Sequence, residues 1–330
     1  MSMLRAQCNR FRFRNLGIAM LTAVVSTLLS TACPASNSEV RHASLVHDGI
    51  SRTYRLFVPL NLSSSNPAPL VLVLHGGGGN GDKMARLTKF DAAARKYGFI
   101  VVYPDAYEKH WNDGRQGTSY TSMDTNVDDV GFLETLIGHI QSQFAIDASR
   151  VYITGASNGG MMTYRMLCER TPLFAAAAPV IANMPTDLVG ACVPAAPIPM
   201  LILNGEEDPL MPWNGGEIAP DFPKRRKVFK GTVVSTEETV AYWSTWNACT
   251  SVGEKTYLPD ADPNDGTRIW VQSHTGGTDG AVVHLYGVEG GGHGWPGGAQ
   301  YLVESIIGKV SQDVDATELI WQFFQNHTRE

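Results

Sequence analysis

The segment Gly155-Ala156-Ser157-Asn158-Gly159 constrains the fold of this chain more than any other part of the sequence. The β-rich run 151–154 precedes it and the helically spaced run 160–167 follows it, so a G-x-S-x-G pattern lies in a strand-to-helix turn. The flanking glycines indicate a turn too tight for larger side chains. Such a turn raises the Ser157 hydroxyl above the sheet edge and directs the first backbone N–H groups of the helix toward it. Because a serine hydroxyl is a poor nucleophile until a base takes its proton, another part of the chain must supply that base.

Strands and helices are predicted to alternate along the rest of the chain. Continuous apolar runs, typical of strands covered on both faces, occur at 70–74, 99–103 and 200–204. We also expect strands at 41–46 and 53–59 around the turn Asp48-Gly49, and at 175–181 and 282–288, with helices at 84–97, 128–144, 235–247 and 313–326. This alternation predicts an α/β fold with a mostly parallel sheet and helices on both faces. Ligands of such sheets lie beyond the carboxyl ends of the strands.

Composition narrows the classes of function. The chain has 330 residues, of which 43% are hydrophobic and 18% charged, and this is typical of a globular protein that can form a single domain. A formal net charge of −6 predicts no basic face for nucleic acid. No cluster of cysteine and histidine has metal-ligand spacing, so we expect neither a metal ion nor a cofactor. Nothing in the sequence indicates an obligate protein partner.

The first 32 residues differ from the remainder and read as a signal peptide. A basic start precedes the apolar run 16–29, which has the length of a signal h-region and is short for a membrane span. Small residues follow, directly before Cys33, and this resembles a bacterial lipoprotein box in which Ser30 replaces the usual leucine. We therefore expect export to the periplasm or the extracellular space, with a lipid anchor at Cys33 as one possibility and an uncleaved anchor as the alternative. Residues 33–40 then read as a short tether and 41–330 as the catalytic domain.

Three cysteines remain in the predicted domain, which allows one disulfide and one free thiol. We hypothesise that Cys168 pairs with Cys192 and that Cys249 stays free. The alternative, three buried thiols, is compatible with the same spacing.

The predicted base is His293, in a glycine-rich segment directly after the last predicted strand. An imidazole that titrates near neutral pH can take the serine proton and return it to a leaving group. Asp208 follows the strand that ends at Asn204, and a carboxylate there would hold the imidazole in one tautomer. Glu206 and Glu207 compete for this role, but their alternative as solvated loop charges is favoured. The order Ser157, Asp208, His293 is the order that accompanies a nucleophile elbow.

The glycine run that follows His75 predicts an oxyanion site, where backbone N–H donors must already point at the developing negative charge. We assign the donors to Gly77 and Asn158. No Gly-Lys-Ser/Thr follows, so the run is not a phosphate loop, and its spacing fits a dinucleotide fingerprint poorly. Tryptophans in loops at strand ends are candidates for the floor of a substrate cleft, with local loop packing as the equal alternative: Trp111, Trp213 and Trp295.

These segments together resemble the esterase/polyhydroxybutyrate depolymerase family, which overlaps the bacterial feruloyl and acetylxylan esterases of the α/β-hydrolase fold. The stretches that carry the resemblance occur in order at 74–79, 110–115, 128–132, 155–162, 208–210, 290–298 and 315–321. The resemblance implies an α/β-hydrolase fold and a secreted serine esterase whose triad maps onto Ser157, Asp208 and His293.

Three substrate classes fit this resemblance. We expect short polyhydroxyalkanoate-type polyesters or oligomers first, then feruloyl or acetyl esters on plant polysaccharide, then short acyl esters in general. A catalytically silent binding protein of the same fold is the alternative from another class, and the complete ordered triad argues against it.

Overall fold

A computed structural model describes residues 39–60, 62, 66–219 and 229–329. The predicted signal peptide and residues 33–38 of the predicted tether lie outside the described residues. Residues 38–330 form one compact unit. Among the helices of the described part, none combines the length and the apolar character needed to cross a bilayer.

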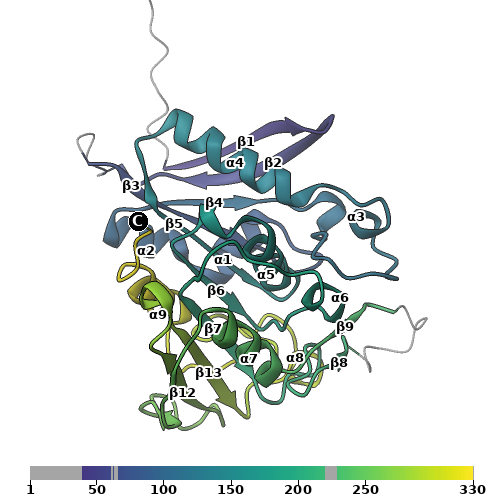
Figure 1. Cartoon of the computed structure of the whole chain (residues 1–330), viewed down its shortest axis with the longest axis vertical. Coiled ribbons are helices and arrows are strands. Elements are labelled where there is room, and N and C mark those ends of the chain that lie inside the picture. The colour runs from purple at the N-terminus through teal and green to yellow at the C-terminus, as the bar shows by residue number, and fades with distance from the viewer. Residues whose placement is uncertain (1–38, 61, 63–65, 220–228, 330) are drawn as a thin grey trace, which may run out of the picture. The chain divides into compact units, whose positions relative to one another are not determined.

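The unit is built on an 11-stranded sheet (Figure 1). Its order is β1-β2-β4-β3-β5-β6-β7-β13-β12-β10, with β11 paired to β12. The run from β4 to β13 is parallel, and antiparallel strands flank it on both sides. The strands are β1 (Val40–His47), β2 (Ile50–Phe57), β3 (Ala68–Leu74), β4 (Ile100–Pro104), β5 (Ile146–Ala156), β6 (Ala176–Val180), β7 (Met200–Gly205), β10 (Ser251–Val252), β11 (Thr256–Tyr257), β12 (Arg268–Thr275) and β13 (Val283–Glu289).

Helices cover both faces of the sheet. One layer contains α1 (Gly81–Thr88), α2 (Phe90–Tyr97) and α9 (Ala316–Phe324), and the other contains α4 (Asp129–Gln143), α5 (Asn158–Arg170) and α7 (Thr236–Trp246). Short elements complete the chain: α3 (Thr121–Asp124), α6 (Thr186–Val189), α8 (Glu304–Ile307), β8 (Gly216–Glu217) and β9 (Thr232–Val233).

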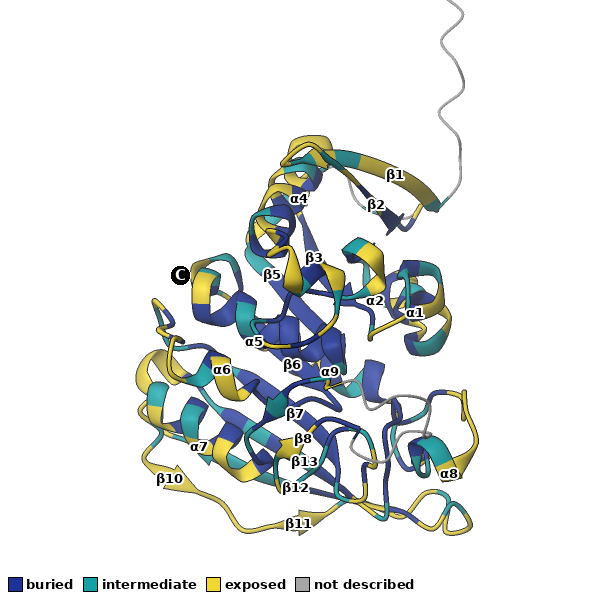
Figure 2. Cartoon of the chain, turned by 90° about the vertical axis from the view of Figure 1, so that its right-hand side faces the viewer, coloured by how far each residue is buried: buried dark blue, intermediate teal, exposed yellow. Residues whose placement is uncertain are grey.

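Strand β3 shows how one sequence run serves two cores. Successive side chains of a strand point to opposite faces. Leu70, Leu72 and Leu74 accordingly pack with α4 and α5, whereas Val71 and Val73 pack with α1, α2 and α9. Figure 2 shows β3 and β6 buried and the edge strands β1, β10 and β11 largely exposed. The predicted mostly parallel sheet with helices on both faces is therefore confirmed.

The structure differs from the sequence prediction at one helix and one strand. The expected helix 84–97 is two helices, because Lys89 takes a left-handed conformation (φ 58°) that ends α1 and begins α2. Apolar residues keep a helical spacing across this break, so the pattern conceals it. The strand β12 was not predicted, because it lies in the antiparallel margin of the sheet and is largely half-buried, without a continuous apolar run.

The expected disulfide is confirmed. Cys168, near the end of α5, is bonded to Cys192 in the loop before β7, and Cys249 is the free cysteine among the described residues. The bridge closes a loop with a sequence separation of 24, which contains β6 and α6, and so restrains the end of the elbow helix relative to the segment before β7.

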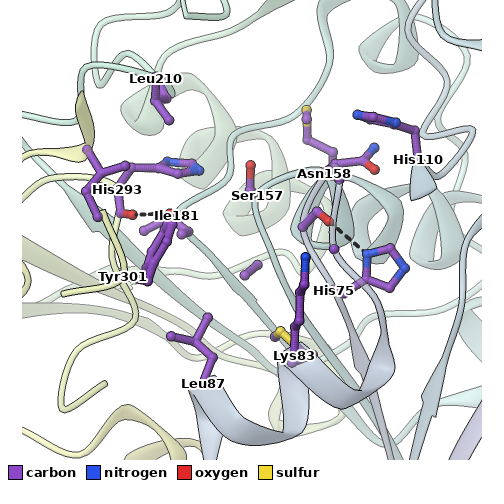
Figure 3. Close-up of a pocket in the computed structure, with 18 of the residues that line it drawn as sticks. His75, Lys83, Leu87, His110, Ser157, Asn158, Ile181, Leu210, His293 and Tyr301 are labelled. Atoms are coloured by element: carbon purple, nitrogen blue, oxygen red, sulfur yellow. Dashed lines mark hydrogen bonds between the residues drawn. The ribbon is translucent and has the colours of Figure 1, made fainter. Parts of the chain in front are cut away.

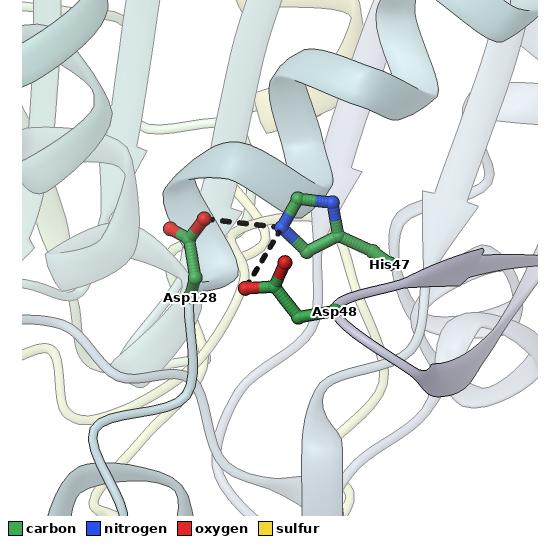
Figure 4. Close-up of side chains that lie close together, drawn as sticks. All are labelled: His47, Asp48 and Asp128. Atoms are coloured by element: carbon green, nitrogen blue, oxygen red, sulfur yellow. Dashed lines mark hydrogen bonds and ion pairs between the residues drawn. The ribbon is translucent and has the colours of Figure 1, made fainter.

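The β1–β2 hairpin is fastened to the start of α4. Its turn is formed by Asp48 and Gly49, both with positive φ, as the hairpin signal predicts. His47 Nε2 lies 3.0 Å from Asp128 Oδ2, while Asp128 Oδ1 accepts the Gly131 N–H at 2.8 Å and caps the helix (Figure 4). Burial raises the pKa of Asp128, but the Gly131 hydrogen bond and the contact with His47 outweigh it and hold the pKa below its usual value.

We predict that Asp128→Ala lowers the free energy of unfolding by about 1 kcal/mol at pH 7, because it removes the helix cap and the partner of His47. Asp128→Asn keeps a cap acceptor and should cost less. Since the pKa of Asp128 is lowered in the folded state, its charge stabilises the fold above the ordinary pKa and ceases to do so as the pH falls through the lowered one. Urea denaturation at pH values from 7 down to about 3 should therefore show that the difference in free energy of unfolding between wild type and Asp128→Ala becomes smaller as the pH falls. A difference that stays constant with pH would contradict this.

Candidate active site

Ser157 stands on the turn between β5 and α5. Its backbone is strained (φ 56°, ψ −121°), and it forms the N-cap of α5 without a side-chain cap. The turn passes very close to the end of β3, because a Cβ atom on Gly159 would lie 2.4 Å from the carbonyl oxygen of Leu74 and 2.6 Å from that of His75. Only glycine fits there. The expected tight elbow is present, and it leaves the Ser157 side chain half-buried.

His293 is presented by the loop after β13. Its backbone N–H donates to the Ile307 carbonyl, and the Tyr301 hydroxyl donates to the His293 carbonyl at 2.9 Å. A Cβ atom on Gly292 would lie 2.1 Å from the Ile307 oxygen, so the glycine allows the loop to lie directly against residues 307–308. Burial, with a smaller contribution from the Asp208 charge, raises the pKa of Tyr301, which keeps its hydroxyl a donor.

Asp208 is the carboxylate that reaches His293. Its Oδ2 lies 2.6 Å from His293 Nδ1, and its Oδ1 accepts the N–H groups of Leu210 and Met211, both at 2.8 Å. The two side chains are 1% and 5% exposed, so water competes little for this bond. An ionised carboxylate only accepts, so the proton lies on Nδ1 and Nε2 is the nitrogen left for a substrate or nucleophile.

Glu206, the rival acid, is engaged elsewhere. Its Oε1 accepts the indole N–H of Trp270 at 2.6 Å and lies 3.6 Å from Lys255 Nζ. The geometry therefore selects Asp208 over Glu206 as the partner of the imidazole.

Ser157 and His293 line one cavity of about 730 Å³. Figure 3 shows the imidazole of His293 directed toward the side of the cavity where Ser157 lies. Apolar side chains form part of the wall, among them Ile181, Leu210, Ile218 and Ile307. The arrangement offers a hydroxyl and a basic nitrogen to a small molecule that is partly removed from water.

Gly77 and Asn158 line the same cavity beside Ser157. A Cβ atom on Gly77 would lie 3.8 Å from the Asn158 Cβ, so the two backbones approach each other. Asn158 begins α5, and its backbone N–H is one of the first helical donors, which have no partner within a helix. Its side chain is fixed from behind: Oδ1 accepts the Trp111 N–H at 2.8 Å, and Nδ2 donates to the Trp111 carbonyl at 3.0 Å and to Asp113 at 2.7 Å.

His75 supports the glycine loop as a neutral imidazole. Its Nε2 accepts the Ala106 N–H at 3.0 Å, so the proton lies on Nδ1, which donates to the Gly76 carbonyl at 2.8 Å. Burial lowers the pKa of His75, in agreement with this neutral form. The ring therefore holds the loop that carries Gly77 in place.

The three tryptophans expected at a cleft floor do not line this cavity. Trp111 is fully buried and donates its indole N–H to the His75 carbonyl at 2.9 Å. Trp295 is 1% exposed and packs edge-on against Phe90. Trp213 is half-buried and packs against Trp270. Loop packing, the alternative interpretation, explains all three, because large aromatic rings near strand ends fill the core under the loops.

Several residues that line the cavity were not predicted as site residues. They are mostly basic or aromatic: Lys83, Arg86, His110, Arg115, Tyr120, Lys230 and Tyr301. His110 and Arg115 belong to a segment singled out for its resemblance, but nothing in their spacing indicated that they face a cavity. Burial, followed by the nearby Arg115 charge, lowers the pKa of Lys230.

His47, Asp48 and Asp128 are a group of potential metal ligands within the described residues, with ligand atoms within 4.8 Å of one another (Figure 4). None of the three lines the cavity. One oxygen of Asp128 already contacts His47 of the hairpin and the other caps α4, so we assign the group to that structural role.

Comparison with known proteins relates this chain to a family of esterases. Residues 52–184 match the profile of the family described as esterase PHB depolymerase. A relative named "Putative esterase NocK", from Nocardia uniformis subsp. tsuyamanensis, is 29% identical over 296 residues, which cover 88% of this chain and 84% of the relative. Over residues 52–184 the chain is similar to this esterase family, and the matches support a carboxylic-ester hydrolase.

Two further matches are named as esterases, and one of them is a solved structure that shares the fold. Feruloyl esterase B of Piromyces equi is 27% identical over 241 residues, which cover 71% of this esterase but only 41% of the fungal protein. The solved structure of the acetyl xylan esterase from Aspergillus awamori matches with a TM-score of 0.57 at 15% identity, covering 86% of this chain and 99% of that one. The fold is that of the α/β hydrolases.

We predict that Gly159→Ala destabilises the esterase by about 3 kcal/mol, because the added Cβ would collide with the backbone at the end of β3. Gly138→Ala is the matched control, since a Cβ there meets nothing within 4 Å on an exposed helix position. It should stabilise by about 0.5–1 kcal/mol. Thermal and urea unfolding measure both variants, and a Gly159→Ala protein as stable as wild type would refute the tight elbow.

Proposed function

We propose that this protein is a serine esterase whose catalytic triad is Ser157, His293 and Asp208. The observation that carries the proposal is the 2.6 Å contact between His293 Nδ1 and Asp208 at the cavity that Ser157 also lines. The contact orients the ring so that its other nitrogen is available to the hydroxyl.

The reaction proceeds through an acyl-enzyme. Ser157 Oγ attacks the ester carbonyl carbon while His293 Nε2 takes the hydroxyl proton, and Asp208 stabilises the imidazolium that forms. The backbone N–H groups of Gly77 and Asn158 stabilise the oxyanion, and each such donor contributes on the order of 3 kcal/mol to lowering the barrier. His293 then protonates the departing alcohol. Water, activated by the same imidazole, hydrolyses the acyl-enzyme and restores Ser157.

The first candidate substrates are polyhydroxyalkanoate-type polyesters or their short oligomers. Support comes from the match of residues 52–184 to the esterase PHB depolymerase family and from a cavity that combines an apolar wall with polar groups. The second candidates are feruloyl or acetyl esters of plant polysaccharide, which the names of two relatives favour.

We further propose that the esterase is exported. The support is the basic start, the apolar run 16–29 and the small residues before Cys33. The lipid anchor at Cys33 stays a prediction, and that residue lies outside the described part of the chain.

We predict that Ser157→Ala reduces kcat on p-nitrophenyl butyrate by at least about a thousandfold, because it removes the nucleophile. The wild type should be labelled covalently by a fluorophosphonate and the variant should not, while both give the same circular dichroism and unfolding temperature. Equal labelling would exclude Ser157 as the nucleophile. The absence of any labelling of the folded wild type would favour a silent binding protein.

We predict that linear hydroxybutyrate oligomers give a higher kcat/KM than methyl ferulate or acetylated xylan, measured with one preparation at one pH. Efficient release of ferulate or acetate, together with no hydrolysis of the oligomers, would make esters of plant polysaccharide the first candidate substrates instead.

A further inference from the structure

The charges that line the catalytic cavity are of one sign. The described lining residues include four fixed cations, Lys83, Arg86, Arg115 and Lys230, and no carboxylate. The chain as a whole carries a formal charge of −6, so this concentration of positive charge is local. A concave site lined by one sign of charge attracts ligands of the other sign, because its low-dielectric walls focus the field.

Arg115 is already paired with a carboxylate. Arg115 is held by Asp113, with Nε at 2.9 Å and Nη2 at 2.8 Å from its oxygens, and both side chains are buried. Asp113 also accepts the Asn158 amide. This pair therefore serves to position Asn158, and its charges largely cancel.

Lys83 differs from Arg115 both in its exposure and in its ion pairing. It is exposed in the first turn of α1, directly after the glycine loop, and Figure 3 shows its ammonium group directed into the cavity. A positive charge in the first turn of a helix interacts unfavourably with the helix dipole, so α1 itself does not stabilise the charge of Lys83. The adjacent Asp82 is engaged by His42 at 3.0 Å and by Arg55 at 3.3 Å. Among the described carboxylates, none forms an ion pair with Lys83.

Arg86 extends the same surface. It lies three residues after Lys83 on α1, a spacing that places two side chains on one face of a helix, and it also lines the cavity. The two cations therefore belong to the α1 wall of the cavity that Ser157 and Asn158 also line.

We propose that Lys83, together with Arg86, forms a carboxylate-binding subsite, so that the preferred substrate is an ester that carries a free carboxylate. The inference rests on the proposed function, since it assumes that the ester reacts at Ser157. A linear hydroxyalkanoate oligomer has a terminal carboxylate, whereas an acetyl or feruloyl ester of a neutral sugar has none. The subsite therefore favours the hydroxyalkanoate oligomer among the candidate substrates.

The test compares the linear dimer of 3-hydroxybutyrate with its primary carboxamide, which has the same ester bond and nearly the same shape but no charge. The wild type should prefer the acid through a lower KM. Lys83→Gln should reduce the ratio of the two kcat/KM values on the order of fivefold, and Lys83→Gln combined with Arg86→Gln should reduce it further. Lys83→Arg should keep most of the ratio. Added salt should raise the KM of the acid more than that of the amide, because the interaction is screened.

Lys89→Gln is the matched control. Lys89 is an exposed cation at the other end of α1 and does not line the cavity, so its removal should leave the ratio unchanged. If Lys89→Gln lowers the ratio as much as Lys83→Gln, general surface charge explains the preference and the subsite is refuted.

The outcomes separate the subsite from the esterase mechanism. Equal kcat/KM for acid and amide, with both reactions dependent on Ser157, would overturn the subsite and leave the esterase mechanism intact. If p-nitrophenyl butyrate is hydrolysed but neither dimer is cleaved, the two dimers are compared as competitive inhibitors, and equal inhibition constants overturn the subsite. No Ser157-dependent hydrolysis of any of the three esters would overturn the proposed function itself.

Discussion

The close approach of the elbow to the end of β3 is the constraint on which the remaining site depends. Ser157 keeps an unfavourable backbone conformation because β5 is fixed between β3 and β6 in the middle of the sheet, and because Gly159 lets the first turn of α5 lie against the Leu74 and His75 carbonyls. A residue in such a conformation persists only where the surrounding structure holds it. Here the buried parallel strands provide that support, and the same contact brings the glycine loop after β3 next to Ser157.

The candidate site is assembled from the carboxyl ends of parallel strands. Gly77 follows β3, Ser157 follows β5, Asp208 follows β7 and His293 follows β13. Because these strands run in one direction, their following loops meet at one edge of the sheet. The two groups in closest contact, Asp208 and His293, follow strands that are neighbours, since β7 pairs with β13. A separation of 85 residues along the chain thus becomes a hydrogen bond of 2.6 Å.

Buried polar groups around the cavity have fixed roles. His75 is neutral and holds the glycine loop, while Asn158 is tied to Trp111 and Asp113, and Asp113 in turn holds Arg115. Each of these side chains is buried and has hydrogen-bond partners, which makes such a network rigid. Rigid support for the loops at the strand ends is what an oxyanion site requires, since its donors must be in place before charge develops. The exposed cations Lys83 and Arg86 are outside this network, which leaves them available to a ligand.

Sequence patterns predicted the elements that depend on local or strictly periodic signals. Apolar runs located the central strands, the turn Asp48-Gly49 located the first hairpin, and the order of glycine-flanked residues pointed to Ser157, Asp208 and His293. Patterns were insufficient where two structures share one pattern. The spacing from Met84 to Tyr97 fits one helix as well as two, and only the left-handed turn at Lys89 distinguishes them. The margin strand β12 lacks the continuous apolar run by which a central strand is recognised.

The sequence alone determined which chemical groups follow which strands, because strand order along the chain and the residues after each strand are local properties. The tertiary structure decided which groups share a cavity. It buried Trp111 and Trp295 in the packing beneath the loops and directed Lys83 toward Ser157. The physical reason is that exposure and direction of a side chain depend on what packs against it from distant segments, and neither residue type nor spacing carries that information.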